Sequence, residues 1–195
     1  MTESSGDPFS SASGPVIPSG PVEPMPQFAM PKLWIGYLLA VATFFGEMIA
    51  VARNPNLGKN VEFGVPPLEI FLPAFIARVY WFVCVYRYHK ILAAVPRYVH
   101  PISPGKAVGF HFIPFFNLYW ILHWPSAIAD FVNARLRAPL MRGAVLGLGA
   151  IAAILCQTFL DAALGIAFLF LATTYLDRFL RRALAATENE SAPQL

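Results

Sequence analysis

Two charged residues within long apolar stretches are the first candidates for chemistry. Glu47 lies in residues 33–52, and Arg78 lies near the middle of residues 68–86. A lone charge near the centre of a bilayer costs about 2.5–3.5 kcal/mol on insertion scales, so each charge needs a partner. The short connection makes the two stretches antiparallel neighbours, and this favours an ion pair between Glu47 and Arg78 that fixes helix packing. An ion or proton relay, or no contact at all, are the alternatives.

A second group of polar side chains lies within residues 104–134, and its members are His111, His123, Ser126 and Asp130. Together with Glu47 the histidines and Asp130 could bind a metal, but a proline lies between the two histidines and their spacing lacks the HExxH pattern. The serine, with His123 and Asp130, lacks the nucleophile elbow of a hydrolase. We therefore predict no catalytic residue, no metal ligand and no cofactor, with these polar side chains facing the cytoplasmic interface.

The run Pro104-Gly105-Lys106 could suggest a phosphate-binding loop. The GxxxxGK[ST] spacing of a Walker A motif is absent, however. Ser103 followed by Pro104 instead predicts a helix start with Ser103 as the N-cap. Lys106 would then lie at the level of the lipid headgroups.

The composition indicates that these residues are positioned by membrane helices. The chain has 195 residues, of which 57% are hydrophobic and 13% are charged, whereas soluble domains have about 25% charged residues. Two cysteines exclude a disulfide scaffold and a Cys-rich metal site. We predict an all-α integral membrane protein whose main partner is the lipid bilayer, with no nucleic acid partner.

The expected membrane domain covers residues 32–185 and has four transmembrane helices, at about 33–52, 68–86, 143–160 and 162–180. The last two are split near Asp161, because one helix over 143–180 would be about 57 Å long, almost twice what a bilayer needs. Residues 1–31 hold seven prolines and are expected to be a disordered cytoplasmic tail, which a reader of proline motifs could bind. Residues 186–195 are expected to be disordered as well.

The segment 104–134 decides the topology. It contains Pro114 and Pro125 and many aromatic residues, which favours a Pro-broken re-entrant or interfacial element over a fifth span. With this element returning to its own side, 11 of the 14 basic residues lie on that side, as the positive-inside rule requires. Both termini are then cytoplasmic.

The same segment carries a resemblance. Its run PGKAVGFHFIPFFNLYW resembles the signature, roughly PGKAxGFxFIPFFNxYW, of uncharacterised multi-pass bacterial membrane proteins, some of which carry a small GYF-like domain that is absent here. The resemblance implies a location in the bacterial inner membrane. The signature-segment residues that it and the polar pattern single out are Pro104, Gly105, Lys106, His111, Pro114, Asn117, Tyr119, Trp120, His123 and Asp130.

Three functions remain open at this point. A non-enzymatic membrane scaffold or interaction protein is favoured, because no catalytic constellation is present and other membrane proteins could bind the aromatic element. A small channel or transporter subunit is the first alternative. Its polar path would use Glu47, Arg78, Asn117 and Asp161. A membrane enzyme that acts on lipid is the second alternative.

Overall fold

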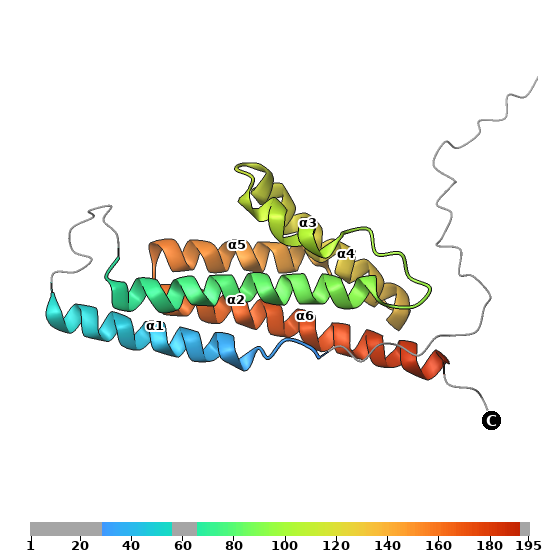
Figure 1. The fold of residues 1–195 in the computed structure, drawn as a ribbon, viewed down its shortest axis with the longest axis horizontal. Coiled ribbons are helices and arrows are strands. Elements are labelled where there is room, and N and C mark those ends of the chain that lie inside the picture. Colours follow the sequence, from blue (N-terminus) through green and yellow to red (C-terminus); the bar gives the residue numbers. More distant parts are fainter. Residues whose placement is uncertain (1–28, 56–65, 192–195) are drawn as a thin grey trace, which may run out of the picture.

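The computed structural model describes residues 29–55 and 66–191 and is helical, with no strand in these two ranges. Figure 1 shows the elements in chain order. They are α1 (Trp34–Arg53), α2 (Leu68–Ala93), α3 (Pro104–Gly109), the short 3-10 helix η1 (Phe110–Phe112), α4 (Phe116–Leu136), α5 (Gly143–Phe159) and α6 (Ala162–Ser191).

Three of these helices are long and apolar enough to cross a membrane, namely α1, α2 and the part Ala162–Thr187 of α6. The fourth predicted span corresponds to α5, which is apolar but has 17 residues. At 1.5 Å per residue α5 is about 26 Å long, close to the lower limit for a span. The structure therefore supports a helical membrane protein, and the count of four spans stays a prediction.

Local sequence signals explain where the helices begin and end. Ser103 Oγ accepts a hydrogen bond from the backbone N–H of Lys106 at 3.4 Å, as expected for the N-cap of α3. Pro114 lies between η1 and α4, so the predicted break in this segment is confirmed. The predicted break near Asp161 is confirmed too, and its carboxylate caps α6 by accepting from Leu164 N at 2.6 Å.

Helix α2 continues beyond the predicted span to Ala93, close to Val95, where the following Pro96 predicts the end of helical structure. The end of α6 differs from the sequence expectation. Helix α6 continues to Ser191, and residues 186–191 are therefore helical rather than disordered. Most of the Pro-rich segment, residues 1–28, lies outside the described residues, together with its PxxP motifs.

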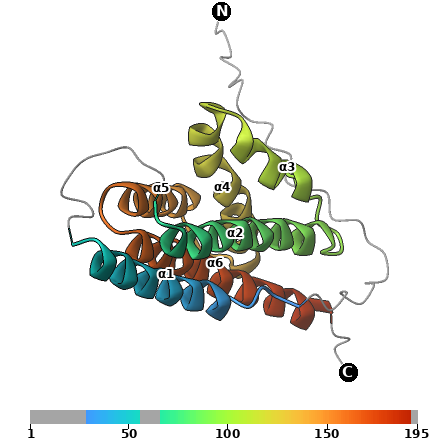
Figure 2. The same cartoon turned by 60° about the vertical axis from the view of Figure 1, so that its left-hand side comes forward.

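Helices α1, α2, α5 and α6 lie side by side along one direction, and the hairpin formed by α3, η1 and α4 lies beside one half of this bundle, tilted away from it (Figures 1 and 2). The hairpin is closed by Trp120, whose indole N–H donates to the Ala107 carbonyl at 3.0 Å. The loop between α2 and α3 contacts α4, because the ring centroids of Tyr98 and Phe131 are 4.7 Å apart. The hairpin thus returns to the end of the bundle that it left.

Two glycines allow α5 to lie directly against α4. A Cβ atom at Gly143 would be 2.2 Å from Ser126 Cα, and one at Gly147 would be 2.5 Å from the Ile121 carbonyl oxygen. Such close backbone approach is the usual role of small residues between membrane helices. This small-residue pair therefore packs within the chain.

Candidate functional site

The predicted ion pair between Glu47 and Arg78 is wrong, because each side chain has a different partner. Glu47 Oε1 accepts hydrogen bonds from the backbone N–H groups of Ala162 and Ala163, at 3.0 and 3.2 Å. Arg78 donates to the side-chain oxygen of Gln157 on α5. The Glu47 side chain is therefore held by backbone amides at the start of α6, beside the Asp161 side chain, and not by a cation.

A sequence signal for this arrangement existed at Asp161. An aspartate directly before an apolar helical run is a typical N-cap, and it indicates that free backbone N–H groups lie next to it. In the prediction from sequence, Asp161 divides the apolar run and is a candidate for a polar path, but it is not the N-cap of a helix. What the sequence does not contain is the rotation of α1 that turns Glu47 toward this helix start.

A second buried polar cluster lies toward the other end of the bundle, and sequence reasoning missed it. Asp177 on α6 is only 7% exposed. Its carboxylate accepts from the Tyr88 hydroxyl at 3.1 Å and from Arg181 Nε at 2.6 Å. The spacing of Asp177 and Arg181 by four residues is visible in the sequence, but the contribution of Tyr88 from α2 is not.

Two histidines pair beside this cluster. His89 Nδ1 lies 2.6 Å from His100 Nε2, and His100 Nδ1 lies 3.3 Å from the Tyr98 hydroxyl. Burial lowers the pKa of His100 to about 4, so its ring is neutral near pH 7. The Nε2 atom of His89 is buried with no hydrogen-bond partner among the described residues.

His111 of the signature segment is buried at the base of the hairpin. Its ring contacts those of Trp81, Phe82 and Trp124, with centroids 5.3 to 6.3 Å away. Neither ring nitrogen has a hydrogen-bond partner in the described part of the chain. Burial is also the main cause that lowers the pKa of His111. This histidine packs as a neutral aromatic ring that docks the hairpin onto α2.

The other candidates for metal binding or hydrolysis do not come together. His123 and Asp130 are exposed, and His123 stacks on Tyr119 with the ring centroids 5.2 Å apart. The Ser126 hydroxyl donates to the Leu122 carbonyl within its own helix, at 3.1 Å. Within residues 29–55 and 66–191, no three His, Cys, Asp or Glu side chains are placed to hold a metal ion.

The remaining signature residues support the hairpin. Pro104 occupies the first turn of α3, and Gly105 and Lys106 are exposed next to it. Asn117 has a buried side-chain oxygen with no hydrogen-bond partner in the described ranges. Tyr119 points away from the bundle, whereas the indole of Trp120 is buried.

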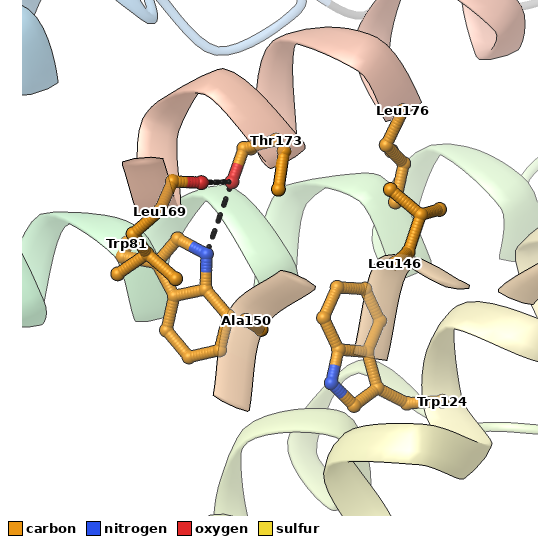
Figure 3. Close-up of a pocket in the computed structure, with 8 residues that line it drawn as sticks. Trp81, Trp124, Leu146, Ala150, Leu169, Thr173 and Leu176 are labelled. Carbon is orange, nitrogen blue, oxygen red and sulfur yellow. Dashed lines mark hydrogen bonds between the residues drawn. The ribbon is translucent and has the colours of Figure 1, made fainter. Parts of the chain in front are cut away.

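A small cavity in the core of the bundle is lined by residues of α2, α4, α5 and α6 (Figure 3). It measures about 20 Å³, which is room for about one water molecule. Trp81 Nε1 donates to Thr173 Oγ1 at 3.1 Å in its wall, and this hydroxyl donates to the Leu169 carbonyl at 2.8 Å. Trp124 lines the same cavity. The core around this cavity is therefore closely packed.

The tip of the hairpin, in contrast, is strongly exposed. Phe115 is 91% exposed. Its φ and ψ angles are 60° and −40°, and the Phe116 N–H donates to the Pro114 carbonyl at 2.7 Å, which is the pattern of a classic γ-turn, a rare and strained conformation. We call the exposed residues around it the aromatic apex, and they are Phe112, Ile113, Phe115, Leu118 and Tyr119.

Comparisons with known protein families, with curated proteins and with solved structures find no match for this chain.

Proposed function

We propose that the protein is a non-enzymatic membrane interaction protein whose hairpin lies in the membrane interface and presents the aromatic apex to lipid or to a neighbouring membrane protein. The exposed Phe115 carries this proposal. Its strained backbone costs free energy in any surrounding, and its exposed ring costs further free energy in water. An apolar surrounding removes the second cost, and aromatic residues are enriched at this level of a bilayer.

The contacts of α2 support the depth of the apex. Tyr80 donates its hydroxyl to the Lys32 carbonyl, just before α1. Two residues further along, the Phe82 ring lies 5.3 Å from that of Phe112. The apex is therefore level with the beginning of α1. Since the 20 residues of α1 are about 30 Å long and match the hydrocarbon core, this level is one membrane boundary.

The basic residues support the orientation. The ends of α2 and α6 that carry Lys90 and Arg182 lie at the hairpin end of the bundle (Figure 1). Placed in a bacterial inner membrane with four spans, this end and both termini would face the cytoplasm. The two alternatives have less support, since the 20 Å³ cavity offers no continuous polar path and the histidines of a lipid enzyme are separated into buried and exposed positions.

The depth of the apex can be measured with spin labels. Both native cysteines are buried, so single cysteines introduced at Phe115 and Leu118 can be labelled in the full chain in liposomes. Accessibility to oxygen and to a water-soluble nickel complex gives the depth of each label. Matched labels replace Trp34 at the start of α1 and Phe44 near its middle, which are both exposed.

We expect the labels at Phe115 and Leu118 to have the depth of the label at Trp34. A depth equal to that at Phe44 would contradict an interfacial hairpin and favour a deeply inserted one. Accessibility equal to that of a label at the exposed Asp130 would show that the apex lies in water, and the proposed function would then fail.

A further inference from the structure

One face of α6 carries a graded stripe of side chains. Residues three and four apart lie on the same helix face, and six exposed residues follow this spacing. They are Leu164, Phe168, Leu171, Tyr175, Arg178 and Arg182, which we call the α6 stripe. The first three are apolar, the tyrosine is amphipathic and the last two are basic. This order matches a phospholipid that lies along the helix, with its chains first and its headgroup last.

The basic end of the stripe borders a hollow in the surface. A cavity of about 410 Å³ is open to the outside there, and it is lined by Leu171, Thr174, Tyr175, Arg178, Phe179 and Arg182. The Tyr175 hydroxyl donates to the Leu140 carbonyl at 3.3 Å, which holds its ring at the cavity wall. The Arg182 guanidinium lies 5.5 Å from the centre of the Phe179 ring.

Neighbouring arginines differ in their partners. Arg181 is bound to Asp177 at 2.6 Å. Arg178 makes no ion pair or hydrogen bond with any residue of the two described ranges. A guanidinium group fits the oxygens of a phosphate with two parallel hydrogen bonds. The lining of this cavity contains two arginines and no carboxylate, so its charge is complementary to an anion.

The depth of the stripe fits the same ligand. Gly36 at the start of α1 lies against the Phe170 ring, and the Tyr37 hydroxyl bonds to Thr174 at 2.9 Å. The membrane boundary at the start of α1 is therefore level with residues 170–174. Arg178 lies about 6 Å further along α6, at the headgroup phosphates, and Leu164 lies within the hydrocarbon.

We propose that the α6 stripe binds an anionic phospholipid of the surrounding bilayer. The phosphate contacts Arg178 and Arg182, and an acyl chain packs along Leu164, Phe168 and Leu171. This surface is separate from the hairpin, and the proposal shares with the proposed function only the membrane boundary at the start of α1.

Lipid binding can be measured by native mass spectrometry of the full chain in an uncharged detergent. The chain is titrated with phosphatidylglycerol and with phosphatidylcholine of the same acyl chains. The R178Q/R182Q variant tests the site. R87Q/K90Q is the matched control. It removes the same amount of positive charge from exposed positions near the end of α2, at the same end of the bundle as Arg178 and Arg182.

We expect the parent chain to bind phosphatidylglycerol more tightly than phosphatidylcholine. R178Q/R182Q should lose at least about ten-fold in affinity for phosphatidylglycerol, since each basic residue near an anionic surface contributes about five-fold. The control R87Q/K90Q should change the affinity by less than about two-fold. Circular dichroism verifies that each variant is folded. If R178Q/R182Q does not fold, the single variant Arg178→Gln is measured instead.

Three results would overturn the proposal. An equal loss in R87Q/K90Q would mean that the lipid follows diffuse charge. Displacement of phosphatidylglycerol by an equal concentration of glycerol phosphate would point to a soluble phosphate ligand. Protection of a cysteine at Leu171 by a second copy of the chain would assign the stripe to a dimer interface. The spin-label depth of Phe115 does not depend on Arg178, so this proposal and the proposed function can fail independently.

Discussion

The two polar clusters of the bundle each hold a carboxylate between helices, but they satisfy it in different ways. At one end, Glu47 accepts from backbone N–H groups at the start of α6. At the other end, Asp177 accepts from the side chains of Tyr88 and Arg181. Backbone donors are present whatever residues occupy those positions, whereas side-chain donors depend on two specific residues. The comparison shows that backbone N–H groups at a helix terminus can hold an acidic side chain between helices without a cation.

The Asp177 cluster should give the largest effect. Asp177→Ala removes the acceptor of the Tyr88 hydroxyl, which is fully buried, and leaves Arg181 without its ion pair. We expect a loss of about 2–3 kcal/mol in the free energy of unfolding, measured by denaturant titration in detergent micelles. Asp177→Asn keeps an oxygen for Tyr88 and should recover about half of it. Equal losses in both variants would mean that the hydroxyl contact contributes nothing.

The Glu47 cluster should respond less, because solvent or other acceptors can reach the first turn of α6. We expect Glu47→Ala to cost about 1–2 kcal/mol, the usual range for the loss of a helix cap. The matched control is Met48→Ala, which shortens an exposed neighbour on the same helix. If the control costs as much as Glu47→Ala, the capping role is wrong.

The histidine pair near the Asp177 cluster should make the free energy of unfolding depend on pH. The pKa of His100 is about 4 in the folded chain and its ordinary value is 6.5. The unfolded chain therefore binds more protons between these values, so stability is complete above about pH 6.5 and decreases as the pH falls toward about 4. Because the His100 side chain is partly exposed, we expect a loss of about 1 kcal/mol in the free energy of unfolding between these pH values.

Thermal unfolding of the detergent-solubilised chain between pH 7.5 and pH 4.5 measures this loss. His100→Gln should reduce the slope of the curve, because it removes one of the groups that gain a proton on unfolding. His111, whose pKa is also lowered by burial, keeps part of the slope. The control His123→Gln removes a histidine from the exposed side of α4. An unchanged slope in His100→Gln would show that other groups cause the pH dependence.

The smallest effects concern the coupling between residues. Glu47 and Arg78 have different partners, so the losses in Glu47→Gln and Arg78→Met should add within about 0.5 kcal/mol. Arg78→Met and Gln157→Leu should instead show a coupling of about 0.6 kcal/mol, typical of hydrogen bonds between membrane helices. Double-mutant cycles in one detergent measure both values. Coupling in the first pair and none in the second would restore the ion pair predicted from the sequence.

The sequence predicts the local features of this fold well. Prolines, the Ser103 cap and the charge at Asp161 each act within one turn of the chain, so the helix start at Pro104 and the break before Ala162 can be predicted from neighbouring residues. The membrane character also follows, because it depends on composition alone.

The partners of the polar side chains could not be predicted, and the reason is geometric. A rotation of α1 by a fraction of a turn decides whether Glu47 faces Arg78 or the start of α6, and no residue in α1 encodes this rotation by itself. The pairing of His89 with His100 likewise depends on a loop that folds back over α2. Such contacts result from the packing of the whole bundle.

The contact between Glu47 and Ala162 also has a consequence for biosynthesis. Glu47 lies on α1, which leaves the ribosome before α6, the helix that carries its N–H donors. Until α6 has been inserted, the carboxylate lacks both of the donors that hold it in the finished protein. A chain that is released before residue 162 therefore keeps an unsatisfied acceptor on α1, and insertion of α6 supplies its donors.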